Sequence, residues 1–402
     1  MFDVILAGSV LLSVFLIAYH HVIFPWWLSR YRRNHPQRPS TTPNRHFRRR
    51  AEDSDLPAVT IVMPAYNEEA VIADKINILG TLDYPADKLF IKLVCDGCKD
   101  DTAMIARRIS CLPQNKHLNL QVVECPINRG KVTVLNEAVT ACRTPIVALS
   151  DVSALVSTDA LLIAADHFTD PKVGVVAGTY RLLDNMNAGE SLYWQYQLAI
   201  KQSEAALGAP MGVHGAFYLF RRELFAPLPL DTINDDFILP MEIVAQGYHA
   251  RYDTQIMALE LEPTSEALER SRRRRIAAGN LQQTLRLAHL LHPRHGGIAL
   301  LFGSGKALRA LMPFILLFTF FASGYLAIDY PYWRLFFALQ VALYGLVAFL
   351  QLEPALAKKP LMQTLQYLVL GHLNGLIGSW YFITGRYRQV WQLTRNHKET
   401  VR

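Results

Sequence analysis

The sequence predicts an α/β protein in which a mostly parallel sheet is flanked by transmembrane helices at both ends of the chain. Between Ala58 and Leu149, short β-branched runs alternate with helical stretches, which is the pattern of a parallel sheet covered on both faces. Long apolar segments lie near the start of the chain and again after residue 309. The 402 residues leave room for one domain of ordinary size and a membrane part.

The first apolar segment, Val4–Trp27, has 24 residues and is interrupted only by His20 and His21. A membrane span needs about 20 residues. A cleaved signal peptide is the alternative, but no basic stretch precedes the segment and no small-residue cleavage site follows it. The segment ends instead with Pro25-Trp26-Trp27, and tryptophans are typical of the membrane surface. We therefore expect residues 1–29 to form an uncleaved transmembrane anchor.

Residues 30–56 are expected to form a basic cytosolic linker. Eight arginines and no carboxylate lie between Arg30 and Arg50, and such segments face the cytosol. The same rule places the following domain, residues 57–291, in the cytosol. The net charge of +7 needs no nucleic-acid partner, because an arginine cluster beside a membrane is attracted to anionic lipid.

The central domain is predicted as an alternating series of strands and helices. Strands are expected at Val59–Met63, Phe90–Val94, Leu120–Val123 and Ile146–Leu149, and helices at Glu69–Leu79, Asp101–Ile109 and Val132–Ala141. After Tyr252 the pattern indicates helix, and residues 265–291 are rich in arginine and leucine. Ligands of such sheets bind beyond the carboxyl ends of the strands, where Asp96, Asp151 and residues 66–69 would lie.

Three apolar segments follow, at Ala310–Ile328, Leu335–Leu352 and Leu361–Ile383. The first two are suitable spans, whereas the third carries several polar residues. If the third also crossed, the basic tail at 385–402 would lie outside the cytosol, against the charge rule. We expect three spans in the whole chain, an interfacial helix at 292–309, and membrane helices within 310–384, the last of them interfacial or re-entrant.

The polar motifs at the strand ends suggest a site for a nucleotide-diphosphate sugar. Transfer of a sugar requires that the diphosphate is held and neutralised and that a base takes the proton of the acceptor hydroxyl. Asp151 is either a ligand of a hard divalent cation or a helix cap. Asp96 either holds the nucleoside or forms a turn, and Lys131 either meets a phosphate or is solvated. The pair Asp235-Asp236 either caps a helix or supplies the base.

In order along the chain, these motifs resemble those of the family 2 inverting glycosyltransferases, which have an A-type nucleotide-sugar-binding fold. The motifs are Pro64-Ala-Tyr-Asn-Glu-Glu69, Cys95-Asp96-Gly97, Asn128-Arg-Gly-Lys131, Ser150-Asp151-Val-Ser153 and Asn234-Asp235-Asp236. They are most similar to the membrane-anchored bacterial branch related to synthases of cellulose, hyaluronan and poly-N-acetylglucosamine. The resemblance implies a UDP-sugar donor, Mg²⁺ or Mn²⁺, a glycan or lipid-linked acceptor, and a multi-pass protein of the bacterial inner membrane that makes exopolysaccharide or cell-envelope glycan.

The resemblance also assigns roles to individual residues. It places on the donor side Pro64, Tyr66, Glu68, Asp96, Lys131, Asp151 and Arg275. Asp151 would bind the metal, and Asp236 would be the general base with Asp235 beside it. Gly215 matches the acceptor-side glycine segment, with His214 next to it, and Trp194 would either stack on a sugar or pack in the core.

Two departures from the family pattern leave alternatives open. Ser153 stands where the family has a second carboxylate, and Arg272 and Ile276 replace the glutamine and tryptophan of the Gln-x-x-Arg-Trp motif of processive synthases. Transfer of a single sugar therefore competes with polymerisation. A non-catalytic membrane scaffold of a polysaccharide export complex is the rival interpretation, and partner subunits for export or polymerisation fit either one.

Overall fold

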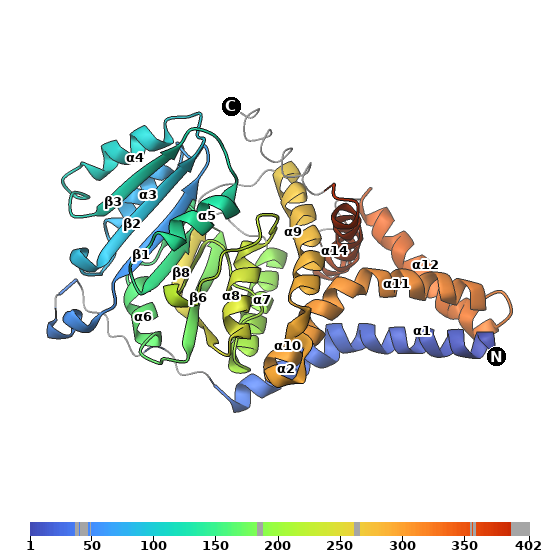
Figure 1. The fold of residues 1–402 in the computed structure, drawn as a ribbon. Helices are drawn as coiled ribbons and strands as arrows, with labels where there is room; N and C mark the ends of the chain where they lie inside the picture. Colours follow the sequence, from blue (N-terminus) through green and yellow to red (C-terminus); the bar gives the residue numbers. More distant parts are fainter. Residues whose placement is uncertain are drawn as a thin grey trace. The chain divides into compact units, whose positions relative to one another are not determined.

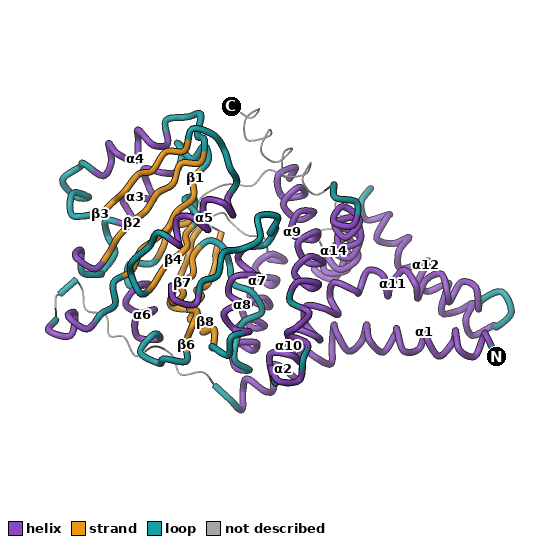
Figure 2. The backbone as a smooth tube through the Cα atoms, in the orientation of Figure 1, coloured by secondary structure: helices purple, strands orange, loops and turns teal. Residues whose placement is uncertain are grey.

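The computed structural model describes residues 1–36, 40, 47–48, 50–182, 188–260, 266–353, 356 and 359–386, except for the side chains of 182, 188–195, 266–273 and 360. The chain divides into two compact units (Figure 1). The helical unit comprises Met1–Asn34, Met186–Ile200 and Thr264–Arg402. The sheet unit comprises His35–Asn185 and Lys201–Pro263. Figure 2 shows that the strands belong to the sheet unit.

An eight-stranded sheet with the order β3-β2-β1-β4-β7-β6-β8-β5 forms the centre of the sheet unit. The strands are β1 (Val59–Ala65), β2 (Leu89–Asp96), β3 (Asn119–Cys125), β4 (Ile146–Ser150), β5 (Ala154–Val156), β6 (Val173–Leu182), β7 (Phe217–Arg221) and β8 (His249–Glu260). The neighbours β3, β2, β1 and β4 are parallel, as are β6 and β8, whereas β4–β7, β6–β7 and β5–β8 are antiparallel. The prediction of a mostly parallel α/β sheet is confirmed.

The first half of the sheet matches the predicted elements closely. All four predicted strands are present, joined by α3 (Ile72–Leu79), α4 (Thr102–Ser110) and α5 (Lys131–Thr140). Helix α5 packs on β1 and β2, and α4 packs on β3 and α3. Strand β4 is buried along its whole length and β1 along nearly all of it. Strands that are covered on both faces have continuous apolar sequences, which is why these were visible in the sequence.

The second half of the sheet unit contains α6 (Ala160–His167), α8 (Asp235–Ala245) and the remaining strands, while α7 (Ala188–Ala206) belongs to the helical unit as far as Ile200. The expectation of helix after Tyr252 is wrong, because β8 continues to Glu260. The register with β6 shifts between Asp253 and Met257, so the alternation of the strand is broken there. At this irregularity the carboxylate of Asp253 lies 2.7 Å from Nε2 of His167 and accepts the backbone N–H of Gln255.

The helical unit begins with α1 (Phe2–Ala18), a π-helical turn and α2 (Phe24–Asn34), and continues with further helices after residue 265. These are α9 (Glu266–Arg286), α10 (Gly297–Leu301), α11 (Leu308–Leu326), α12 (Pro331–Leu350) and α14 (Pro360–Ile383). Within the unit, α1 packs along α11 and α9 packs along α14. Short 3-10 helices over both units occupy Ala51–Asp55, Ala86–Lys88, Arg222–Leu224, Ala288–Leu291 and Pro293–His295.

Three helices of the described chain are long and apolar enough to cross a membrane, namely Phe2–Asn34, Gly297–Leu326 and Pro331–Leu350. They overlap the three segments expected to span, although the expected segments at 310–328 and 335–352 each end two residues beyond the helix. Helix α14, the segment expected to be interfacial or re-entrant, is not among them. The region expected as an interfacial helix consists of a 3-10 turn at Pro293–His295 followed by the start of the long helix at Gly297.

Candidate active site

The loops that follow β1 and β2 are joined to each other at the carboxyl edge of the sheet. Because the strands are parallel, Ala65 at the end of β1 lies beside Cys95 of β2. The backbone N–H of Glu68 donates to Oγ1 of Thr102 at 2.8 Å. Thus the loop that carries Tyr66 and Glu68 lies against the loop that follows Asp96. Two further hydrogen bonds join these loops. The backbone N–H of Lys99 donates to Oδ1 of Asn67 at 2.9 Å, and that of Glu69 donates to the carboxylate of Asp100 at 3.0 Å.

Asp96 holds the loop that carries Lys131. Its buried carboxylate accepts the backbone N–H of Arg129 at 2.9 Å and that of Gly130 at 2.8 Å, and its carbonyl accepts from the side chain of Asn128. Carboxylates that accept several backbone N–H groups fix a loop firmly. This positioning role was not foreseen from the sequence, while the predicted contact of Asp96 with a nucleoside stays a prediction.

Gly97 is required by this close approach of two loops. Its φ is +67°, and a Cβ atom there would lie 2.3 Å from the backbone nitrogen of Asn128. We expect Gly97→Ala to lower the free energy of unfolding by about 2–4 kcal/mol, adding left-handed strain to overpacking against backbone. The thermal midpoint in detergent measures this. Gly247→Ala is the control, because Gly247 also has positive φ but open space around it, so only the strain of about 1–2 kcal/mol applies. If the free energy of unfolding fell by the same amount in both variants, the proposed clash at Gly97 would be contradicted.

Lys131, Asp151 and Asp235 form an ion-pair cluster at the same edge. Nζ of Lys131, the first residue of α5, lies 3.2 Å from Oδ1 of Asp151 and 3.4 Å from Oδ2 of Asp235. Burial lowers the pKa of Lys131, but the carboxylates of Asp151, Asp235 and Asp236 outweigh it and raise that pKa above its usual value. Burial raises the pKa of Asp151, and the ammonium of Lys131 more than reverses this. Both groups are therefore charged at neutral pH.

The two acidic motifs lead into different secondary structure. Asp151 is followed by β5 rather than by a helix, so the alternative of a helix cap is wrong for it. Asp235 and Asp236 lie in the first turn of α8, where the helix dipole favours negative charge. Asp236 lies against Gly215, since a Cβ atom on that glycine would lie 3.3 Å from Oδ2 of Asp236. The predicted acceptor-side glycine is thus next to the predicted base.

Two tyrosines of the site were missed in the sequence. The ring of Tyr180, on β6, stacks on that of His214 with centroids 3.6 Å apart and an interplanar angle of 11°. Tyr218, on β7, is buried, and burial together with Asp235, Asp236 and Asp151 raises the pKa of its phenol well above the usual value. Tyr180 lies in no recognisable motif, and Tyr218 closes the 213–218 segment that carries Gly215, but both belong to strands that were not predicted.

Two predicted site residues belong to the helical unit and not to the sheet unit that carries the cluster. Arg275 belongs to α9 of the helical unit, so its contact with a diphosphate stays a prediction. Trp194 lies on α7, but its side chain is outside the described part of the chain.

The residues around Asp151 suit a divalent cation that binds together with a diphosphate. In the described residues, no group of three or more His, Cys, Asp or Glu side chains is arranged to hold a metal ion by itself. Mg²⁺ is usually bound by one or two carboxylates plus phosphates and waters, so a single well-placed carboxylate is sufficient for it. The carboxylate of Asp151 offers oxygen atoms of the kind such a cation binds, and its role as a metal ligand stays a prediction.

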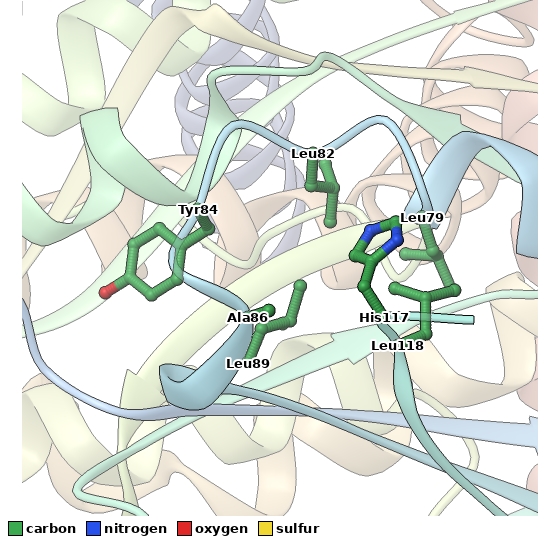
Figure 3. A pocket seen from close by; sticks show the side chains of 7 residues that line it. All are labelled: Leu79, Leu82, Tyr84, Ala86, Leu89, His117 and Leu118. Carbon is green, nitrogen blue, oxygen red and sulfur yellow. The ribbon is translucent and has the colours of Figure 1, made fainter. Parts of the chain in front are cut away.

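A small apolar hollow elsewhere in the sheet unit is not a substrate site (Figure 3). Its volume is about 10 Å³, close to the minimum that holds one water molecule. It is lined by Leu79, Leu82, Tyr84, Ala86, Leu89, His117 and Leu118. Leu89 starts β2 and Leu118 precedes β3, so the hollow lies at the amino ends of the strands, opposite to the carboxylates.

Comparison with known proteins identifies the family. Residues 57–279 match the description "Glycosyltransferase like family 2". The chain belongs to this family. Among solved structures, it resembles the mannosyltransferase PcManGT from Pyrobaculum calidifontis in complex with GDP-Man and Mn²⁺, with a TM-score of 0.69, 22% identity, and coverage of 93% of this chain and 99% of that one. This likeness confirms the predicted A-type glycosyltransferase fold.

Curated relatives are polysaccharide synthases. The chain is 24% identical over 228 residues to the poly-beta-1,6-N-acetyl-D-glucosamine synthase of Staphylococcus epidermidis, covering 55% of this chain and 54% of that protein. It is 26% identical over 217 residues to the synthase of the same name from Staphylococcus aureus, covering 52% and 51%. The chain thus spans about half the length of these relatives.

Proposed function

We propose that the protein is a membrane glycosyltransferase that moves a sugar from a UDP-sugar to a glycan or lipid-linked acceptor, with inversion at the anomeric carbon. The observation that carries this proposal is the cluster of Lys131, Asp151, Asp235 and Asp236 at the carboxyl edge of an A-type sheet. Membership of the family supports the transferase activity. The polysaccharide synthases among the relatives support a product that belongs to an exopolysaccharide or a cell-envelope glycan.

In the proposed mechanism, the two sides of the cluster have different tasks. On the donor side, Asp151 would hold Mg²⁺ or Mn²⁺, which neutralises the diphosphate leaving group when it is bound. Lys131 lies between Asp151 and Asp235, so its ammonium is placed to meet phosphate oxygens. On the acceptor side, Asp236 would take the proton of the attacking hydroxyl. Because this hydroxyl attacks the sugar directly, no nucleophilic side chain is needed.

Nucleotide release tests this proposal and names the donor. The purified protein would be mixed with a panel of UDP-sugars, Mg²⁺ or Mn²⁺, and membrane lipid extract, and GDP-mannose is included because PcManGT was solved with it. We expect release with one donor and its loss in Asp236→Asn. Product length then separates transfer of one sugar from polymerisation. Nucleotide binding without release on any acceptor would favour the non-catalytic scaffold of an export complex.

We further propose that the protein is a multi-pass protein of the bacterial inner membrane with its sheet unit in the cytosol. The eight arginines between Arg30 and Arg50 and the three apolar helices support this arrangement. A reporter that is active only in the periplasm, fused after residue 56, is expected to be inactive. Activity of that fusion would contradict the proposed orientation.

A further inference from the structure

Lys75 is a completely buried lysine at the centre of the sheet unit. It lies on α3, its exposed fraction is 0%, and its Nζ donates to Oγ of Ser150 at 2.7 Å and to the backbone carbonyl of Ala154. Lysine is almost never fully buried unless its ammonium has partners, because burial of an unpaired charge costs free energy. The position of these two partners therefore indicates what the lysine does.

The partners of Lys75 are the residues on either side of the Asp151 loop. Ser150 is the last residue of β4, and Ala154 is the first residue of β5. One side chain thus ties together both ends of the short loop that carries Asp151 and Ser153. Both hydrogen bonds need only N–H groups of the lysine as donors. The ammonium and the neutral amine both have such groups, so either protonation state can make the two bonds.

The hydrogen bonds continue from Ser150 to the acceptor side. The hydroxyl of Ser150 lies 3.2 Å from the carbonyl of Ala216 and 3.3 Å from that of Asp151. The carbonyl of Ala216 also accepts the backbone N–H of Asp151 at 3.1 Å. Ala216 follows Gly215, the glycine that lies against Asp236. A buried chain of polar groups thus connects Lys75 to Asp151 and to the segment beside Asp236.

Carboxylates near Lys75 favour its charged form. Burial lowers the pKa of this lysine to about 7, against the opposing effects of Asp151 and Glu260.

Ser153 makes the position of Asp151 more critical, because the chain has a serine where the family resemblance implies a second carboxylate. The loop then offers a bound cation one carboxylate, that of Asp151, so its position matters more.

We propose that Lys75 is a positioning residue, which holds the Ser150–Ala154 loop and the Gly215–Ala216 segment so that Asp151 and Asp236 keep a fixed spacing. The proposal rests on the proposed function, in which Asp151 binds the donor side and Asp236 is the base. Because Lys75 is fully buried, its proposed action runs through Ser150 and Ala154.

Lys75→Met tests the proposal, because methionine has nearly the same length and shape but no donor. We expect the affinity for Mn²⁺ plus UDP and the kcat/KM of the full chain in detergent to fall about 10–100-fold, as is usual when a group that orients a metal ligand is removed. Loss of a nearby positive charge alone would instead tighten the binding of Mn²⁺. The direction of the change in Mn²⁺ affinity, measured by titration calorimetry, therefore separates positioning from simple charge.

Two more variants keep the test decisive. Ser150→Ala leaves the lysine but removes its link to Ala216, so we expect the affinity for Mn²⁺ plus UDP to fall here too. In the double variant with Lys75→Met, the loss of binding free energy should be less than the sum of the two single losses. Lys88→Met is the matched control. Lys88 also donates to two backbone carbonyls, those of Ser54 and Leu56, at 2.5 and 2.6 Å, but it lies before β2 at the opposite edge of the sheet. We expect it to lower the thermal midpoint without changing Mn²⁺ or UDP affinity.

The outcomes distinguish this inference from the proposed function. If the wild-type protein turns over and Lys75→Met binds Mn²⁺ as tightly as the wild type or more tightly, the role of Lys75 is overturned and the transferase proposal stands. If the wild-type protein binds UDP and Mn²⁺ but does not turn over, the transferase proposal is contradicted. Weaker binding of Mn²⁺ in Lys75→Met would in that case still support the positioning role. If Lys75→Met does not fold, wild-type affinity in Ser150→Ala would overturn the inference. A wild-type chain that binds neither Mn²⁺ nor UDP would overturn both.

Discussion

Replacing Asp236 by asparagine is expected to lower kcat by about 10²–10⁴-fold, the usual contribution of a general base. Asparagine has the same shape, so the backbone bond from Val213 N–H to the carbonyl of residue 236, 3.1 Å long, should remain. The carboxylate oxygen beside Gly215 is what the variant loses. Donor binding should stay within about twofold, since the ion pairs of Lys131 involve Asp151 and Asp235 instead. Nucleotide release and calorimetric binding of UDP with Mn²⁺ measure the two quantities.

Two control variants locate this effect. Glu242→Gln removes a carboxylate from the same helix α8 and should leave kcat unchanged. Asp235→Asn removes a partner of Lys131 and should weaken donor binding more than it lowers kcat. If Asp235→Asn abolished turnover while Asp236→Asn kept a substantial part of it, the base would be Asp235 and the assignment within the pair would be reversed.

The donor half of the site could be predicted because its strands are buried and parallel. Strands β1 and β4 have nearly continuous apolar sequences, and the polar residues that follow them necessarily meet at one edge. Asp151 was therefore placed correctly at a strand end, and the structure pairs it with Lys131, the first residue of the helix that precedes β4 along the chain. Gly97 belongs to the same category, because a glycine after a strand is a recognisable turn signal.

The acceptor half could not be predicted in the same way. Strands β6, β7 and β8 pair in mixed directions, and the irregularity at Asp253 removes the alternation that would reveal β8. The stacking of Tyr180 on His214 joins residues that are far apart in the sequence, and Tyr180 lies in no motif. Lys75 was missed for another reason. Lysine on a short amphipathic helix is normally solvated, and only the fold shows that this one faces inward to Ser150 and Ala154.

Replacing Asp151 by asparagine is expected to weaken Mn²⁺-dependent binding of UDP by about 100-fold or more, beyond the 10–100-fold typical of groups that only orient a ligand. The reason is that Asp151 is the carboxylate proposed to bind the cation, and Ser153 offers no second one. Stability should change little, by about 1 kcal/mol or less, because the side chain of Asp151 is 39% exposed and solvent screens its ion pair. Calorimetry with Mn²⁺ and the thermal midpoint measure the two effects.

The pH dependence of the ion-pair cluster gives a second test of the same residue. Because the pKa of Asp151 is lowered in the folded chain, its stabilising contribution is present above the unfolded value of about 4 and is lost as the pH falls through the lower folded value. The pKa of Lys131 is raised, so its contribution is present below about 10.4 and is lost only as the pH rises through the higher folded value. Between these limits neither group titrates, and any change of donor affinity from pH 5 to 8 must come from another group. A pKa of Asp151 at or above about 4, measured by NMR titration of its carboxyl group in the folded chain, would show that Asp151 is not held ionised by Lys131.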